Sequence, residues 1–322
     1  MAERGLEVEP QRNPESREPL RVLVTGAGSY VGTSFAGWLG RHSGRYKVDT
    51  LDMLDPGWRE HPFSGYDAVY HVAGIAHVTA DPSKADLYRR VNTELAVETA
   101  RKAKDEGVPQ FIFMSSAIVY GQDDPVGTID PIRRDTRPNP ADVYGRSKWE
   151  AEQGIAALAD DSFTVSILRS PVVYGPGSRG NFPRLLRLAR RCPVFPAAGA
   201  RRSMIYIDHL CEFVRLVIEH RAGGLFFPQD AEPVDPSEVV REYRRQTGRR
   251  TWMVRGLVPL LRFAGRYVRG VGKLFGSKVY DPALSAAPGG GEYRSLDFPE
   301  TIRRCRAAMD APAAAGSRGK RR

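Results

Sequence analysis

The chain has 322 residues, of which 41% are hydrophobic, and this composition excludes an intrinsically disordered protein. Its formal net charge is +10, but no recognition motif accompanies the basic residues, so we expect no nucleic-acid partner. Its cysteines, Cys192, Cys211 and Cys305, are too few and too scattered for a disulfide framework or a zinc site, and we predict no metal.

The two ends of the chain are predicted to lie outside the folded region. Residues 1–19 are polar and contain three prolines, and residues 310–322 are mostly small or basic, so we expect a disordered lead-in and a disordered basic tail. The lead-in contains no apolar signal segment, and no run in the chain approaches the ~20 apolar residues that span a bilayer. We therefore expect a cytoplasmic protein without a membrane span.

Apolar strands and helical patterns alternate along residues 20–175. We predict strands at 21–25, 47–52, 67–73, 110–114 and 164–168, and helices at 30–42, 84–106 and 144–159. Such alternation is typical of a parallel sheet covered by helices on both faces. The sequence therefore predicts an α/β fold with a Rossmann-type doubly wound parallel sheet.

The pattern loosens after residue 175. We expect a helix at 181–191, a strand at 204–207, a helix at 209–219 capped by Asp208, and a strand at 224–228. Residues 204–229 are predicted to complete the Rossmann domain of residues 20–175. The remaining segments, 176–203 and 230–309, are predicted to form a smaller substrate-binding lobe, and ligands usually bind in a cleft between two such lobes.

A glycine-rich turn joins the first strand to the first helix. Glycines at such a turn let the backbone approach a pyrophosphate, whose charge then lies at the helix N-terminus. Asp52 ends the second strand, where a carboxylate binds the adenosine ribose and repels a 2′-phosphate. The sequence therefore predicts NAD as the cofactor, and its binding residues here are Gly26, Gly28, Ser29, Tyr30, Val31, Gly32 and Asp52.

Tyr144 and Lys148 are four residues apart on a predicted helix, so their side chains share one face. A lysine ammonium beside a phenol favours the tyrosinate and lowers the pKa of the tyrosine from its usual value near ~10. The pair is therefore predicted to act as a base that takes a proton from a sugar hydroxyl near neutral pH.

Other motifs follow in order along residues 20–230. They are His71-Val72-Ala73-Gly74, Asn92, the run from Ser115 to Gly121, Arg169, the run from Val173 to Gly177, and Arg202. With the glycine turn and the Tyr144/Lys148 pair, they make a sequence that resembles the extended short-chain dehydrogenase/reductase family. The resemblance is to its NAD-dependent nucleotide-sugar epimerases, of the UDP-glucose 4-epimerase type and of the polysaccharide and capsule branch.

This resemblance implies roles for particular residues. Tyr144 would exchange a proton with the C4 hydroxyl of the sugar, Lys148 would bind the nicotinamide ribose, and Ser116 would share the proton transfer. The resemblance adds Ala73, Gly74 and Asn92 to the cofactor site. It also implies a UDP-linked sugar as substrate, bound by His77, Ser116, Asn181 and Arg202. His77 is equally well explained as a structural histidine, and His71 is better explained as a core residue.

The resemblance also implies a homodimer that pairs through the helices at 84–106 and 144–159. Three departures from the family pattern stand out. Ser29 occupies a place that usually holds glycine, and Val172 one that often holds a substrate-facing asparagine. The segment from Asp52 to Tyr66 is too short for the usual extra strand, so Trp58 and Arg59 are expected to cover the adenine instead.

The residues after Ser116 restrict which of the family's reactions the protein can catalyse. The 4,6-dehydratases of the family carry an Asp-Glu pair there, whereas Ala117 and Ile118 cannot exchange protons. We therefore predict a 4-epimerase that oxidises C4 transiently and reduces it again. An NAD(P)H-dependent 4-ketoreductase and a non-catalytic NAD-binding protein are the alternatives.

Residues 256–275 mix apolar and basic positions at helical spacing. One interpretation is contact with a membrane surface. The other is a group of substrate-lobe helices that pack on the core, which we favour because Pro259, Gly265, Gly270 and Gly272 would interrupt a long amphipathic helix.

Overall fold

The computed structural model describes residues 18–42, 44–76, 82–267 and 275–311. Most of the predicted lead-in and tail, and His77, lie outside these residues. Within them, no helix is long and apolar enough to cross a membrane.

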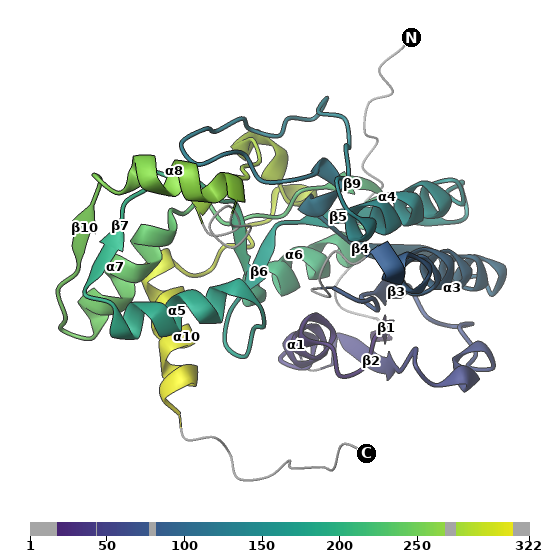
Figure 1. Cartoon of the computed structure of the whole chain (residues 1–322). Helices are drawn as coiled ribbons and strands as arrows, with labels where there is room; N and C mark the ends of the chain where they lie inside the picture. Colours follow the sequence, from purple (N-terminus) through teal and green to yellow (C-terminus); the bar gives the residue numbers. More distant parts are fainter. Residues whose placement is uncertain (1–17, 43, 77–81, 268–274, 312–322) are drawn as a thin grey trace, which may run out of the picture.

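A six-stranded sheet forms the centre of the molecule (Figure 1). Its order is β2-β1-β3-β4-β5-β9, and every neighbouring pair is parallel. The strands are β1 (Leu20–Thr25), β2 (Tyr46–Leu51), β3 (Ala68–His71), β4 (Gln110–Ser116), β5 (Thr164–Ser170) and β9 (Gly224–Phe226). The predicted α/β fold with a doubly wound parallel sheet is confirmed.

Side chains of β1 alternate between two cores because successive residues of a strand point to opposite faces. Val22 and Val24 belong to one core with helices α1 (Tyr30–Leu39) and α6 (Ile207–Glu219). Leu23 belongs to the other core, with α3 (Leu95–Asp105) and α4 (Val143–Ala156). Helices therefore cover both faces of the sheet.

Four further helices lie to the left of the sheet in Figure 1. The helices there are α5 (Asn181–Arg191), α7 (Pro236–Gln246), α8 (Val258–Tyr267) and α10 (Phe298–Asp310). Two short parallel sheets accompany them, β7 (Val194–Pro196) with β10 (Trp252–Val254) and β6 (Val172–Tyr174) with β8 (Met204–Tyr206). Short helical turns occur at Pro56–Arg59, Pro82–Lys84, Ala117–Tyr120, Pro282–Ser285 and Pro288–Gly290.

Two predicted helices differ from the structure. The helix expected at 84–106 is divided into α2 (Ala85–Tyr88), a wide π-helical stretch (Arg89–Glu94) and α3. The wide stretch contains the buried Asn92, and π-type turns are often found at functional sites. Helix α6 begins at Ile207 with Tyr206 as its N-cap, so the prediction that Asp208 caps it is wrong; Asp208 lies in the first turn.

Candidate active site

The glycine turn after β1 is shaped by close packing. Gly26 has a φ of +90°, and a Cβ atom there would lie 3.0 Å from the backbone of Ala73. A Cβ on Gly32 would lie 2.7 Å from the Ser29 Oγ atom. Ser29 itself is the N-cap of α1, and its hydroxyl accepts a hydrogen bond of 3.0 Å from the Gly32 amide. The serine that departs from the family pattern therefore stabilises the start of the helix.

Asp52 lies next to this turn. It follows β2 directly, and the Gly26 amide donates a hydrogen bond of 2.8 Å to the carbonyl of Leu51. The Asp52 side chain is exposed and accepts a hydrogen bond of 3.0 Å from the Leu54 amide. A carboxylate is thus available beside the glycine turn, as the sequence predicts.

Trp58 does not reach this region as expected. It is only 2% exposed and packs in the core on the α3 and α4 face of the sheet. Arg59 lies over the Trp58 ring at 4.7 Å and forms two hydrogen bonds with Glu98. The expectation that Trp58 covers the adenine is wrong, because burying the indole in the core leaves no face for a ligand.

Ser116, Tyr144 and Lys148 come together at the carboxyl end of β4. Ser116 ends β4 and is hydrogen-bonded to the Tyr144 side chain in the first turn of α4. Lys148 is 5% exposed and donates a hydrogen bond of 2.9 Å to the Met114 carbonyl. Its ammonium also lies 4.6 Å from the centre of the Phe113 ring.

The pKa values of this pair differ from the expectation. Burial raises the pKa of Tyr144 to about 12, and the hydrogen bond with Ser116 only partly opposes this. Burial lowers the pKa of Lys148 to about 8, against the attraction of Glu152. The prediction that Lys148 lowers the pKa of Tyr144 is therefore wrong for the protein by itself, since the ammonium is directed to the Met114 carbonyl. An additional positive charge beside the phenol is needed to favour its ionised form.

Asn92 connects the loop after β3 to α4. Its Oδ1 atom accepts a hydrogen bond of 2.8 Å from the Ile75 amide, and its Nδ2 atom donates to Ile75 and to Ser147, each at 3.1 Å. Gly74 lies between these groups, because a Cβ there would be 2.9 Å from the Asn92 Oδ1 atom and 3.5 Å from the Lys148 ammonium. Asn92 thus positions the loop that carries Ala73 and Gly74.

A buried ion pair between Arg169 and Glu152 stabilises the end of β4. Arg169, on β5, donates hydrogen bonds of 3.1 and 2.6 Å to Glu152 and one of 2.5 Å to the Tyr120 hydroxyl. Glu152 also accepts a hydrogen bond from the Ser115 hydroxyl. The sequence analysis missed Glu152, although it lies one further turn along the helix face that carries Tyr144 and Lys148.

The predicted substrate-binding residues do not form a cluster like that of Ser116, Tyr144 and Lys148. Arg202 forms an ion pair with Asp123, and its side chain is only 14% exposed. Asn181 is exposed at the first residue of α5. Val172 is 45% exposed at the start of β6. The Arg202 guanidinium therefore already faces a carboxylate, which a phosphate would have to displace or share.

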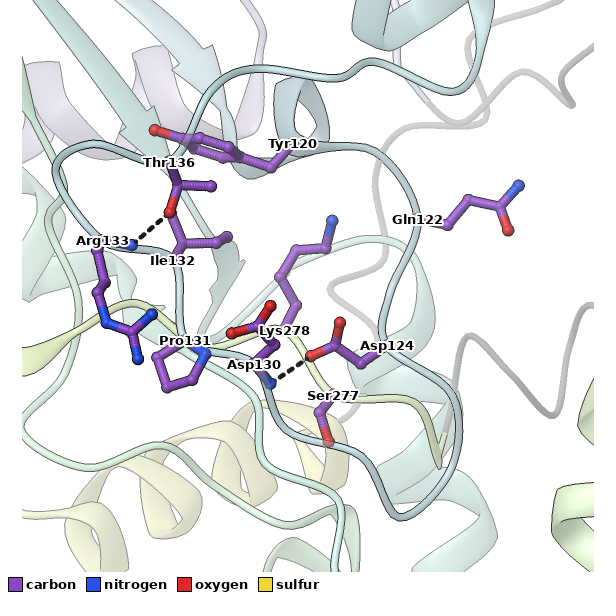
Figure 2. Close-up of a pocket in the computed structure, with 10 residues that line it drawn as sticks. All are labelled: Tyr120, Gln122, Asp124, Asp130, Pro131, Ile132, Arg133, Thr136, Ser277 and Lys278. Carbon is purple, nitrogen blue, oxygen red and sulfur yellow. Dashed lines mark hydrogen bonds between the residues drawn. The ribbon is translucent and has the colours of Figure 1, made fainter.

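A cavity of about 170 Å³ lies beside the site (Figure 2). It is bounded by the loop of residues 122–136 and by Ser277 and Lys278, and Tyr120 lies at one end. The Lys278 ammonium donates a hydrogen bond of 2.6 Å to the Gly121 carbonyl. Ser116, Tyr144 and Lys148 do not line this cavity, so it adjoins the Tyr120 side of the site and is separate from the catalytic candidates.

His71 is a core residue, as expected. It is fully buried between the rings of Phe111 and Phe113, and its Nδ1 atom is 2.9 Å from the Thr25 hydroxyl. Its Nε2 atom has no hydrogen-bond partner. Burial, with a smaller contribution from Lys148, lowers the pKa of His71 to about 3.

We expect His71 to make the protein sensitive to acid. Below its usual pKa of ~6.5 the unfolded chain binds a proton that the folded protein excludes until about pH 3, so stability falls as pH falls through this range. From pH 6.5 to 5 the loss is about 2 kcal/mol. Urea denaturation should show wild type losing about this much more than His71→Leu between these pH values. An equal loss in both proteins would contradict the prediction.

The described residues contain no group of three or more His, Cys, Asp or Glu side chains that could hold a metal ion. The groups assembled at the carboxyl edge of the sheet are instead a hydroxyl, a phenol, an ammonium and a tight glycine turn. They are suited to binding a dinucleotide and exchanging a proton with a hydroxyl.

Comparisons with known proteins agree with this chemistry. The sequence profile of the NAD dependent epimerase/dehydratase family matches residues 22–226. A UDP-glucose 4-epimerase of Vibrio cholerae is 33% identical over 74% of this chain and 80% of its own length. An N-acetyl-alpha-D-glucosaminyl-diphospho-ditrans,octacis-undecaprenol 4-epimerase of Escherichia coli is 27% identical over 63% of this chain and 64% of its own length.

Solved structures show the same fold. A UDP-glucuronic acid 4-epimerase from Bacillus cereus in complex with NAD superimposes with a TM-score of 0.68. The alignment covers 90% of this chain and 98% of that chain, at 16% sequence identity. Such a low identity supports the architecture alone.

Proposed function

Because the chain belongs to the NAD dependent epimerase/dehydratase family, we propose that it is a nucleotide-sugar 4-epimerase that acts on a UDP-linked sugar. The observation that carries this proposal is the hydrogen-bonded Ser116–Tyr144 pair with Lys148 on the same helix. These groups lie at the carboxyl edge of a parallel sheet whose first turn is shaped for a dinucleotide. The 4-epimerase activity of the Vibrio cholerae relative supports the choice of reaction.

The cofactor is NAD, and the residues around the glycine turn fit it. The turn leaves no room for a Cβ at Gly26 or Gly32, and the exposed Asp52 carboxylate lies beside it. Gly28, with a φ of +78° and open space around it, allows a close approach of the backbone to phosphate. Tyr30, Val31, Ala73 and Gly74 complete the proposed binding surface. Bound NAD would supply a hydride acceptor and a positively charged nicotinamide ring.

Tyr144 is proposed to take the proton of the C4 hydroxyl as hydride leaves C4. Ser116 donates or accepts a hydrogen bond at the same oxygen and keeps the phenol in position. Lys148 orients the nicotinamide ribose and adds positive charge. The 4-keto sugar would then have to rotate in the site, and Tyr144 would return the proton to the C4 oxygen.

We propose that residues 20–175 and 204–229 bind the cofactor, and that 176–203 and 230–309 bind the substrate. Asn181 and Arg202 would contact the diphosphate, since a guanidinium offers paired donors to phosphate. His77 is proposed for the same region. Two copies are proposed to pair through α3 and α4, in the cytoplasm.

We expect Asp52→Asn to weaken the preference for NAD over NADP by at least about tenfold, because the carboxylate repels the 2′-phosphate. Titration of the purified protein with each dinucleotide measures the two dissociation constants. Asp55→Asn is the matched control, since Asp55 is exposed nearby and caps a short turn. If the ratio of the dissociation constants for NAD and NADP is unchanged in Asp52→Asn, the adenosine ribose does not bind beside this carboxylate.

Isotope labelling separates epimerase from 4-ketoreductase. A UDP-hexose carrying deuterium at C4 should be converted to its C4 epimer with the label retained and without added cofactor. Mass spectrometry and NMR measure label and configuration. No conversion of the UDP-hexose, together with stoichiometric oxidation of NADH or NADPH by a UDP-4-keto sugar, would instead identify the 4-ketoreductase. A 4,6-dehydratase is disfavoured, because Ala117 and Ile118 carry no group that exchanges protons.

A further inference from the structure

Large apolar side chains are exposed together on and beside α8. Leu257, Leu260, Phe263 and Tyr267, which we call the α8 strip, are 38%, 63%, 62% and 74% exposed. Spacings of three, three and four residues place them on one face of the helix. The ring centroids of Phe263 and Tyr267 are 5.3 Å apart, and the two rings are tilted relative to each other. Single exposed apolar residues are common, whereas a continuous strip marks an interaction surface.

The α8 strip faces away from the protein. Val258 and Leu261, on the other side of the helix, pack against the large core, which is the packing expected from the sequence. Figure 1 places α8 at the outer edge of the lobe to the left of the sheet. One apolar side of α8 therefore packs against the core, and a second apolar side is exposed to solvent.

The segment around the α8 strip is basic. No Asp or Glu occurs between Glu242 and Asp281, whereas Arg and Lys recur throughout this stretch. Arg249, Arg250, Arg255 and Arg262 are exposed. An apolar face bordered by arginines, on a short helix, matches the surface of a bilayer that contains anionic lipids. A second copy of the same face fits poorly, because the segment offers no carboxylate to its own arginines.

Neighbouring strands also expose apolar side chains, and a hydrogen bond joins α8 to the loop that bounds the cavity. Trp252 on β10 is 74% exposed, and its partner in register on β7, Val194, is 46% exposed. The Arg262 guanidinium donates a hydrogen bond of 3.2 Å to the carbonyl of Val126, in the loop that bounds the cavity of Figure 2. The surface thus adjoins the proposed active-site region without contributing to it.

We propose that the α8 strip docks on the surface of an anionic phospholipid bilayer. Leu260, Phe263 and Tyr267 enter the boundary between headgroups and acyl chains, and the flanking arginines contact lipid phosphates. The docking is peripheral and reversible, and it orients the cavity-bounding loop toward the membrane. It rests on this surface alone and does not depend on the proposed reaction.

Co-sedimentation with lipid vesicles tests the proposal on the full-length protein with bound NAD. Wild type should pellet with vesicles of phosphatidylcholine and phosphatidylglycerol, and much less with phosphatidylcholine alone. The triple variant Leu260→Ser/Phe263→Ser/Tyr267→Ser should lose at least about tenfold in partitioning, because three apolar side chains are removed from the contact. Leu54→Ser and Leu188→Ser, exposed elsewhere at 88% and 38%, are matched controls that should bind like wild type.

A double variant tests the contribution of the arginine charges. Arg255→Gln/Arg262→Gln should reduce binding to the anionic vesicles by about 30-fold, because each arginine near the surface contributes about fivefold. The NAD content and melting temperature of each variant verify that it is folded, and Phe263→Ser alone replaces the triple variant if that protein does not fold.

Three outcomes would overturn the proposal. Wild type that stays in solution with anionic vesicles has no docking surface. Equal partitioning of wild type and the apolar variant places the contact elsewhere. A wild-type dimer that ignores vesicles and becomes a monomer in the apolar variant, by sedimentation velocity, identifies the strip as a self-association surface. Turnover of a water-soluble nucleotide sugar should be unchanged in the apolar variant, and this separate readout keeps failure of docking distinct from failure of the 4-epimerase proposal.

Discussion

Replacing Tyr144 by Phe should lower kcat by about 1,000-fold while NAD remains bound, because positioned acid–base groups contribute about 10²- to 10⁴-fold. The variant keeps the ring that packs 6.0 Å from Tyr88 and loses only the hydroxyl that bonds to Ser116. The phenol is the proposed proton acceptor at C4. Steady-state turnover and the NAD content of the purified variant are the two measurements.

Tyr88→Phe is the matched control for this experiment. Its ring is buried and lies beside that of the half-buried Tyr144, so removing its hydroxyl perturbs the same region. We expect its kcat to stay within a few-fold of wild type. Full activity in Tyr144→Phe would refute the proposed mechanism, whereas loss of NAD from Tyr144→Phe would indicate a binding role in place of a catalytic one.

Removing the Arg169 charge should cost about 3 to 5 kcal/mol of unfolding free energy, because it leaves Glu152 buried without its partner. The side chains of the pair are only 6% and 2% exposed, and Arg169 also holds the Tyr120 hydroxyl. We expect Arg169→Met to show this loss in urea denaturation. The support of the strand that ends in Ser116 would weaken with it.

The double variant Glu152→Met/Arg169→Met distinguishes loss of the ion-pair attraction from the cost of leaving the Glu152 charge buried without a partner. It should be more stable than Arg169→Met, since no buried ion then lacks a partner. Arg303→Met is the control for an exposed pair, because the Arg303 side chain is 57% exposed beside Glu300, and it should cost no more than about 1 kcal/mol. Equal losses in Arg169→Met and Arg303→Met would contradict the assigned burial.

Local patterns were sufficient to predict the sheet and the main candidates of the site. Strands such as Gln110–Ser116 contain an unbroken apolar run, here residues 111–114, which is typical of a strand buried on both faces. The glycine turn, Asp52 and the Tyr144/Lys148 pair depend on spacings within one or two elements, which the backbone geometry of strands and helices determines.

Contacts between distant segments could not be predicted in this way. Trp58 was expected at the ligand and is instead in the core, because the strongest favourable contribution for an indole is burial wherever the fold offers room. The partner of Arg202 is Asp123, and no spacing along the chain relates these two residues. The same holds for Glu152 and Arg169, which meet only because α4 lies across β5.

The sequence by itself determined the cofactor class, the doubly wound sheet and the candidates for the proton-exchanging groups, since each depends on short-range periodicity or on side-chain type. Only the tertiary structure decided the electrostatic state of those groups and which apolar residues remain outside. Burial raises the pKa of Tyr144 and lowers that of Lys148, and it leaves the α8 strip uncovered. Burial is a property of the assembled fold, because the atoms that exclude water from a side chain come from segments far away along the chain.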